Sequence, residues 1–193
     1  MSLWTDLVAE VIAVTNRPDL TAEIDLGLRQ ALRTAHKSAK FWRDLAVVPV
    51  TGLTLDTLQQ IPIAANLPQF RQAIYVKSNT NDKFYDPVDI TDLVDSYGAL
   101  KLNIYYGVGT TINIRSSAPE DAYEIAYYKY PIVSPKDSMD SWIATDYGDL
   151  LVALTGSLVL GMVGEQEIKA TLDKFVAIGM QDLISDNLEI QGR

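Results

Sequence analysis

The pattern of apolar positions predicts helices near the start of the chain. Over residues 2–15 the apolar side chains recur at helical spacing, and Asn16-Arg17-Pro18-Asp19 then breaks the helix. A second helix is expected over residues 20–45, with its apolar side chains on one face at the 3.6-residue period. These two segments predict a pair of antiparallel helices joined by a short turn.

After Leu45 the pattern changes from helical spacing to alternation. Residues 47–50 are rich in β-branched side chains, and prolines punctuate the short segments that follow. Gly107-Val108-Gly109 fits a hairpin turn between two strands. The candidate strands are residues 59–63, 73–77, 88–93, 99–106, 110–115 and 122–130.

Helical spacing returns in the last part of the chain. Asp140 or Ser141 can cap a helix whose apolar residues run from Trp142 to Met162, and Gly164 can close it. Its most apolar stretch, residues 150–163, is too short to span a bilayer core of about 30 Å and predicts a buried helix. A last helix is expected over residues 165–187, leaving a polar tail.

The order of these elements predicts an α+β fold. The helices at both ends are expected to pack together as a helical bundle, with an antiparallel β lobe inserted between them. The expected ranges are 1–46 for the first part of the bundle, 47–133 for the β lobe, and 134–193 for the helices and tail that complete the bundle.

Composition removes several classes of function. The 193 residues include no cysteine, which excludes a disulfide framework, a thiolate zinc site and a cysteine nucleophile. The net charge of −9 argues against a general nucleic-acid binder, although an acidic total can hide a local basic stripe. The first residues lack the features of a signal peptide, so synthesis in the cytoplasm is expected.

Catalytic motifs are hard to find. The single histidine, His36, has no recognisable partner for a catalytic triad or a two-histidine metal site, so we expect it in a surface or interface role. Acidic pairs, Asp89 with Asp92 and Asp137 with Asp140, could hold calcium or divide acid and base roles, but they match no EF-hand or glycosidase pattern. We therefore predict a protein that is not an enzyme and needs no cofactor or metal.

The most informative cluster is a basic stripe on the second predicted helix. Successive rotations of 100° place its members within a sector of about 120°, away from the apolar face. The stripe consists of Arg29, Arg33, His36, Lys37, Lys40 and Arg43. It could line a DNA passage, touch an acidic neighbouring subunit or keep the helix soluble.

Tyrosines gather in the last predicted strands before Pro131. Because a strand alternates its faces, these rings cannot all enter one core, and some are expected in an interface or a ligand platform. The candidates for such an aromatic surface are Tyr105, Tyr106, Tyr128 and Tyr130.

Two patterned segments resemble a known family. The first runs from Leu7-Val8 through Asn16-Arg17-Pro18-Asp19-Leu20 to Phe41-Trp42-Arg43-Asp44-Leu45. The second runs from Tyr127-Tyr128-Lys129-Tyr130-Pro131 through Ser141-Trp142 to Tyr147-Gly148-Asp149-Leu150. Together, over almost the whole chain, they resemble the head-to-tail adaptor proteins of tailed bacteriophages, a group distantly similar to the tail tubular A proteins of short-tailed phages.

The resemblance implies a structural role in the virion, at the head–tail junction. It implies a ring of twelve copies between the portal protein and the tail nozzle or tail fibre proteins, with genomic DNA passing through the centre and no membrane involved. It also implies that the C-terminal region docks onto the portal. That region is Asn187, Leu188, Glu189, Ile190, Gln191, Gly192 and Arg193. The alternative is a β-sandwich carbohydrate-binding module that uses the tyrosines as an aromatic platform.

Overall fold

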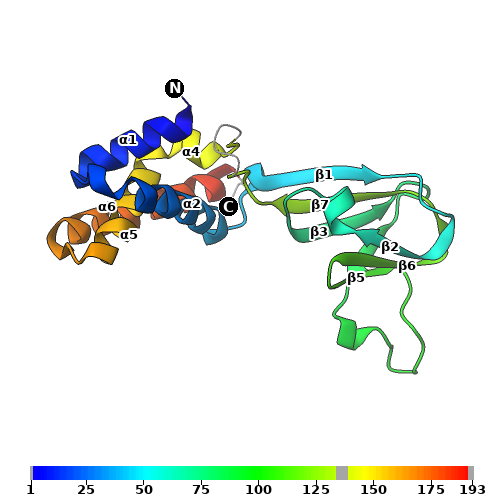
Figure 1. Ribbon diagram of the computed structural model, residues 1–193. Helices are drawn as coiled ribbons and strands as arrows, with labels where there is room; N and C mark the ends of the chain where they lie inside the picture. The colour runs from blue at the N-terminus through cyan, green and yellow to red at the C-terminus, as the bar shows by residue number, and fades with distance from the viewer. Residues whose placement is uncertain (1, 134–138, 191–193) are drawn as a thin grey trace. The chain divides into compact units, whose positions relative to one another are not determined.

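A computed structural model describes residues 2–133 and 139–190 of the protein. The chain forms two compact units (Figure 1): residues 1–43 with 130–193, and residues 44–129. The first unit is helical and the second contains the strands, so the predicted α+β class is confirmed. The boundaries between the units lie a few residues before the expected positions at 46 and 133.

The helical unit is built around one apolar helix. It contains α1 (Leu3–Thr15), α2 (Thr21–Ser38), α4 (Trp142–Asp146), α5 (Gly148–Val163) and α6 (Gln166–Ile190). Helix α5 packs against α1, α2 and α6, and it buries Leu151, Val159 and Leu160 completely. A β-carbon at Gly156 would lie 2.8 Å from Leu172 of α6, so the glycine allows the close approach of these two helices.

The start of α1, the start of α4 and the end of α5 lie where the sequence predicted them. Helix α1 follows the first predicted helix closely, with Ser2 as its N-cap. Ser141 caps α4, and Gly164 closes α5 with a left-handed φ of 81°. The stretch 150–163 forms most of α5 and is buried as expected, whereas the expected continuous helix from Trp142 is interrupted at Tyr147.

Two other ends were predicted wrongly. Helix α2 ends at Ser38 rather than at residue 45, because Ala39 is extended with a φ of −145° and Phe41 turns into the core. A 3-10 turn, Trp42–Asp44, then leads into the first strand. Helix α6 continues to Ile190, past the expected end at residue 187.

The β unit contains one mixed sheet of seven strands. The strands are β1 (Leu45–Val50), β2 (Asp56–Pro62), β3 (Phe70–Ser78), β4 (Phe84–Pro87), β5 (Ile104–Val108), β6 (Thr111–Glu120) and β7 (Tyr123–Lys129). Their order is β1-β7-β3-β4-β5-β6-β2, and β4 with β5 form the parallel pair among antiparallel neighbours. A short helix, α3 (Ile63–Asn66), follows β2. The β5–β6 hairpin turns at Gly109, which has a φ of 57°.

The strand predictions failed between β4 and β5. Residues 88–93, expected as a strand, contain a 3-10 turn, Ile90–Asp92, which the Asp89 side chain caps by accepting a hydrogen bond from Thr91 N at 2.9 Å. Of the expected strand 99–106, only the part from Ile104 onward pairs with β6. Both segments alternate in sequence, but Ile90, Leu100 and Leu102 are about half exposed, and burial begins only at Ile104.

The β core is rich in tyrosine. Tyr85, Tyr123 and Tyr127 are buried among Val, Ile and Leu side chains. The hydroxyl groups of Tyr85 and Tyr123 both bond to Ser116 Oγ, at 3.1 and 3.0 Å. Burial raises the pKa of Tyr123 to about 12, which keeps its hydroxyl neutral.

Glu120 forms a second buried polar group in the same unit. Its carboxylate, 1% exposed, accepts hydrogen bonds from Ser78 Oγ at 2.8 Å and from Asn81 Nδ2 at 2.6 Å. Ser78 Oγ in turn accepts from the backbone N–H groups of Thr80 and Asn81. The carboxylate therefore fixes the turn between β3 and β4.

Candidate functional site

The predicted basic stripe does not exist as one surface. Lys40 and Arg43 lie beyond the end of α2, so helical geometry no longer aligns them with the other members. His36 is buried, with its Nε2 2.9 Å from Ser141 Oγ and its ring edge-on to Trp142 at 5.9 Å. A surface or interface role was expected for His36, but the side chain is only 1% exposed within the helical unit. The side chain instead ties α2 to the cap of α4.

The remaining basic residues of α2 have different surroundings. The half-buried Arg29 guanidinium lies 5.9 Å from the centre of the Trp4 ring. Arg33 and Lys37 are exposed, and Lys37 Nζ lies 5.8 Å from the centre of the Tyr130 ring. A hollow of about 350 Å³ is lined by Arg33, Lys37, Tyr130, Pro131 and Val133. We call it the α2 hollow.

Of the four tyrosines expected in an aromatic surface, one is buried and three are half-buried. Tyr105 is buried, and its hydroxyl donates a hydrogen bond to Ile74 O at 3.2 Å, so its assignment to an interface was wrong. Burial also raises the pKa of Tyr105. Tyr106, Tyr128 and Tyr130 are half-buried, and Tyr130 belongs to the helical unit while the other three belong to the β unit.

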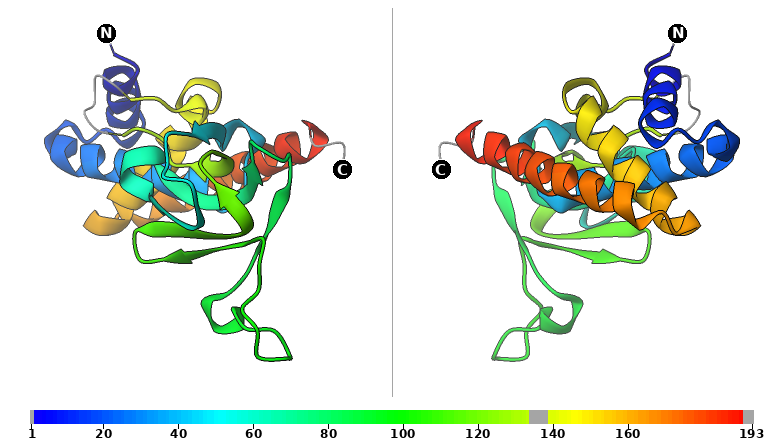
Figure 2. Two further views of the ribbon diagram at one scale, coloured as in Figure 1. Left: turned by 90° about the vertical axis from the view of Figure 1, so that its right-hand side faces the viewer. Right: turned by 90° about the vertical axis from the view of Figure 1, so that its left-hand side faces the viewer.

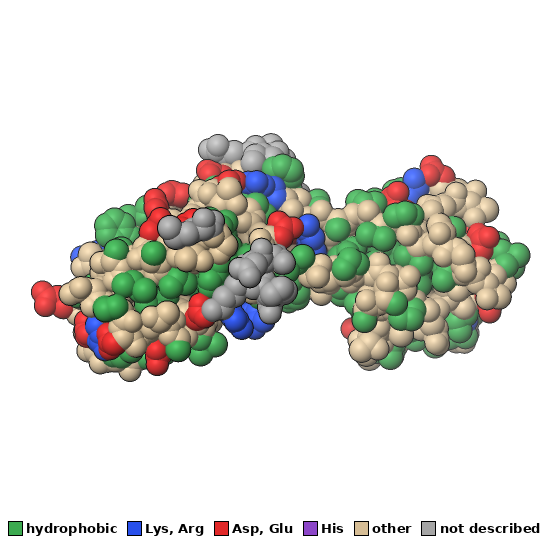
Figure 3. Space-filling model, turned by 45° about the horizontal axis from the view of Figure 1, so that its top comes forward, with side chains coloured by type: hydrophobic (Ala, Val, Ile, Leu, Met, Phe, Trp, Pro, Cys, Tyr) green, Lys and Arg blue, Asp and Glu red, His purple; other side chains and the backbone are tan. Residues whose placement is uncertain are grey.

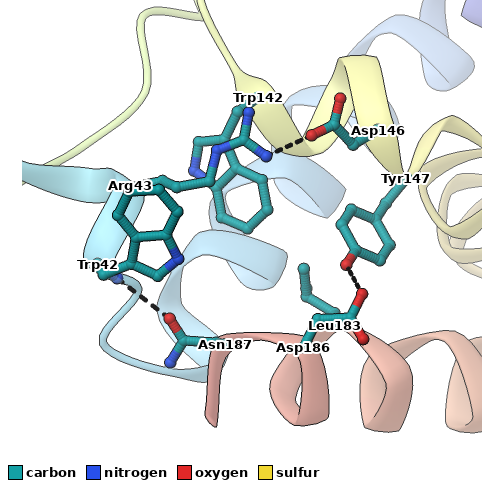
Figure 4. A pocket seen from close by; sticks show the side chains of 8 residues that line it. All are labelled: Trp42, Arg43, Trp142, Asp146, Tyr147, Leu183, Asp186 and Asn187. Atoms are coloured by element: carbon teal, nitrogen blue, oxygen red, sulfur yellow. Dashed lines mark hydrogen bonds and ion pairs between the residues drawn. The ribbon is translucent and has the colours of Figure 1, made fainter. Parts of the chain in front are cut away.

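The pocket with the richest side-chain chemistry lies in the helical unit. We call it the tryptophan pocket; it has a volume of about 440 Å³ and joins the 3-10 turn after α2, helix α4 and the last turns of α6 (Figure 4). Its lining residues are Trp42, Arg43, Trp142, Asp146, Tyr147, Leu183, Asp186 and Asn187.

Local folding rules explain how these side chains reach the pocket. Phe41 is fully buried, and its ring packs edge-on against the Trp142 ring with the two ring centres 5.2 Å apart. This contact fixes the chain just before Trp42 and Arg43. Ser141 Oγ accepts a hydrogen bond from Ala144 N at 3.2 Å, so Ser141 is the N-cap of α4 and Trp142 is its first residue. The break at Tyr147 then separates α4 from α5 and turns the tyrosine toward α6 (Figure 4).

Charged and aromatic groups in the tryptophan pocket are already paired with each other. The Arg43 guanidinium lies over the Trp142 ring at 4.6 Å and forms an ion pair with Asp146. The Tyr147 hydroxyl donates a hydrogen bond to Asp186. Burial together with this bond raises the pKa of Tyr147 to about 12.

Asn187 was expected at the start of a portal-docking tail, but it is part of the fold. It is 7% exposed; its Oδ1 accepts a hydrogen bond from Trp42 N at 3.1 Å, and its Nδ2 donates one to Lys40 O at 3.3 Å. Leu188 remains 42% exposed on α6, and the backbone stays helical through Glu189 and Ile190. Gln191, Gly192 and Arg193 lie outside the described residues.

The pocket is lined by residue types that occur often at protein interfaces. Tryptophan, tyrosine and arginine are the residues that most often dominate binding energy at protein interfaces. Trp42 is 41% exposed and Arg43 is also exposed, so both can be reached from outside. Within residues 2–133 and 139–190, no cluster of three or more His, Asp or Glu side chains could hold a metal ion.

The acidic pairs considered from the sequence have structural explanations where they are described. Asp89 caps a 3-10 turn, and its hydrogen bonds with Thr91 lower its pKa. Asp140 pairs through its backbone with Ile132, whereas Asp137 lies outside the described residues.

Part of the tryptophan pocket could be noticed from the sequence. Trp42, Arg43, Trp142 and Tyr147 all fall in the two segments that carry the phage-adaptor resemblance. Asp146, Leu183 and Asp186 were missed. The partners Tyr147 and Asp186 are separated by 39 positions, and no local spacing pattern relates them.

Comparison with known proteins identifies no family for this chain. No model of a known protein family matches the chain, and no curated protein matches it. Among the helices described, none is both long enough and apolar enough to cross a membrane.

Proposed function

We propose that this protein is a structural virion component, a head-to-tail adaptor that forms a ring between the portal and the tail of a bacteriophage. One observation carries the proposal. The two segments that resemble adaptors are about a hundred positions apart, yet both supply residues to the tryptophan pocket. The last turns of α6 complete the pocket, next to the C-terminal residues that the resemblance assigns to portal docking.

The surface supports a role as a subunit of a larger assembly. Hydrophobic side chains lie open to solvent on both units on the face drawn in Figure 3. Large apolar residues that are at least half exposed occur on α2, α5 and α6 and on the β unit, including Leu26, Met162, Phe175 and Ile178 in the helical unit and Leu55 and Phe84 in the β unit. Phe175 and Ile178 line one groove together with Leu172, and contiguous exposed apolar surface is typical of proteins that are covered by partners.

The distribution of charge fits a passage for DNA that does not hold the DNA tightly. Many phosphate contacts would retain DNA strongly. The total charge is −9, Arg43 is paired with Asp146, and Arg17 is paired with Asp19 and Glu165. Of the predicted stripe, Arg33 and Lys37 are exposed on α2, and Lys40 is exposed beyond its end.

A portal-binding assay tests the proposal. The full-length protein is mixed with purified portal rings from the same phage and sedimented, and we expect it to move with the rings. Trp42→Ala should reduce the bound fraction about tenfold or more, because an exposed tryptophan is a frequent centre of binding energy. Leu26→Ala is the matched control, since Leu26 is 61% exposed in the same unit and lies outside the tryptophan pocket.

Failure of the unmodified protein to bind the portal would contradict the adaptor proposal. The carbohydrate-binding alternative predicts a different result, namely binding to a glycan array that Tyr106→Ala and Tyr128→Ala abolish. Tyr105 cannot contribute to such a platform without unfolding its surroundings, because it is buried.

A further inference from the structure

The β unit carries a long extension with exposed apolar side chains. Residues 88–103, which we call the arm, connect β4 to β5 and extend beyond the strands (Figure 2). Connections of this length in compact domains are usually functional. The exposed apolar residues of the arm are Ile90, Val94, Tyr97, Leu100 and Leu102; each is about half exposed or more, and Tyr97 is 94% exposed.

The arm is held in shape by its own hydrogen bonds. Near its tip, Asp95 Oδ1 accepts from Tyr97 N at 2.9 Å and from Ala99 N at 2.8 Å. Further back, Lys101 N donates to Leu93 O at 2.9 Å, next to a β-bridge between Val94 and Leu100. The tip is therefore preorganised, which lowers the entropy cost of binding.

The arm and the α2 hollow carry opposite charges. The arm has three aspartates, Asp89, Asp92 and Asp95, against one lysine, Lys101. The α2 hollow presents Arg33 and Lys37 beside apolar surface from Tyr130, Pro131 and Val133. Arg33 has no ion-pair partner among the described residues.

We propose that the arm of one copy docks into the α2 hollow of a neighbouring copy. Tyr97 then packs against Tyr130 and Pro131, while Asp92 faces Arg33. When each copy uses its arm on one neighbour and its α2 hollow on the other, the contact is head-to-tail, and its repetition closes a ring if the rotation between copies allows it. Closure into a ring rests on the proposed function, and the contact between the arm and the α2 hollow is the one that would build that ring.

Charge decides between this receptor and an apolar groove elsewhere in the helical unit. A groove between α5 and α6 is lined by apolar residues that include Leu172, Phe175 and Ile178, but Asp149 and Asp182 also line it. An acidic arm would meet like charge there, which disfavours binding. The α2 hollow offers both apolar surface and opposite charge.

Cross-linking tests the contact directly, because the chain has no cysteine of its own. One preparation of full-length protein carries Ser96→Cys next to the arm tip, and a second carries Pro131→Cys in the α2 hollow. When the two are mixed with a short bifunctional maleimide, we expect a covalent dimer of one copy of each. Lys174→Cys replaces Pro131→Cys in the control, since Lys174 is exposed on α6 of the same unit. Mixed dimer no more abundant than in the control would overturn the contact.

Charge reversal provides the second measurement. By analytical ultracentrifugation, Asp92→Lys alone or Arg33→Glu alone should weaken self-association about tenfold, and the two changes together in one chain should restore it. Unchanged association in both single variants would overturn the proposal. Self-association without the mixed cross-link would reject this contact but leave a ring possible, whereas a strong cross-link in a protein that does not bind the portal would retain the contact and reject the adaptor function.

Discussion

The two units of the protein are stabilised by different kinds of core. The helical unit buries mainly aliphatic side chains around α5, with Trp4 and Phe41 added at its edges. The β unit buries tyrosines whose hydroxyl groups share Ser116 Oγ, together with the Glu120 carboxylate. Packing of apolar surface therefore dominates one core, while the other also depends on a satisfied polar network.

This difference has consequences for what each unit tolerates. An aliphatic core accepts other apolar residues of similar volume, with modest losses of stability. A buried polar network does not, because removing one partner leaves another polar group without a hydrogen bond in a low-dielectric surrounding. We expect substitutions in the β core to be more sensitive to chemical type, and substitutions in the helical core to be more sensitive to volume.

The largest effect is expected at Tyr123. The side chain is fully buried, so Tyr123→Ala should lower the free energy of unfolding by about 4 kcal/mol. Tyr123→Phe keeps the ring and removes only the bond to Ser116, at a cost of about 1 kcal/mol. Urea unfolding followed by circular dichroism measures both values, with Tyr97→Ala as the exposed control. Equal losses for Phe and Ala would show that the hydrogen bond, not the ring, carries the stability.

Leu151 tests the helical core in the same way. It is completely buried on α5, and Leu151→Ala should cost about 3 kcal/mol, whereas Leu151→Met should cost less than about 1.5 kcal/mol. Ile178→Ala is the control, because Ile178 is 60% exposed and its loss should change stability by about 0.5 kcal/mol or less. A methionine variant as unstable as the alanine variant would contradict the idea that this core responds mainly to volume.

Asn187 is a polar exception within the helical unit. Asn187→Leu removes the bonds to Trp42 N and Lys40 O and should lower the free energy of unfolding by about 1.5 kcal/mol. Gln181→Leu, on the exposed surface of the same helix, is the matched control. Full stability of the Asn187→Leu variant would mean that the turn after α2 is fixed by Phe41 alone.

The smallest expected effect is a dependence on alkaline pH. The pKa of Tyr147 in the folded protein is raised to about 12, above its ordinary value of 10, so its contribution to stability is complete below pH 10 and is lost as the pH rises through 12. Tyr147→Phe should reduce the loss of stability over this range, measured by urea unfolding at a series of pH values. The other tyrosines whose pKa values are raised, mainly by burial, contribute to the slope that remains: Tyr75, Tyr85, Tyr105, Tyr123 and Tyr127. An identical slope in the variant would contradict the Tyr147 assignment.

The sequence predicted elements where its periodicity coincided with burial. Helix α1 and the buried part of α5 follow their apolar spacing because one side of each helix packs against the core. The end of α2 was missed because helical spacing continues through Phe41 and Trp42, although Phe41 reaches the core from an extended segment. Alternation in residues 88–93 indicated a strand, but it lies in the exposed arm.

The site was less predictable than the fold. Sequence patterns singled out Arg43 as part of a helical stripe, yet its position is set by the turn after α2 and by its contacts with Trp142 and Asp146. His36 was expected at the surface because its helical neighbours are basic, but its partner Ser141 lies 105 positions away. Contacts at such separations depend on the packing of whole helices, which local spacing does not encode.

Counting copies in the virion tests the central claim most directly. DNA-filled particles are purified on a gradient from a culture that produces this protein, and quantitative mass spectrometry compares the chain with the portal and major capsid proteins. The adaptor proposal predicts an amount close to that of the portal and far below that of the capsid protein. Absence of the chain from purified, infectious particles would contradict it.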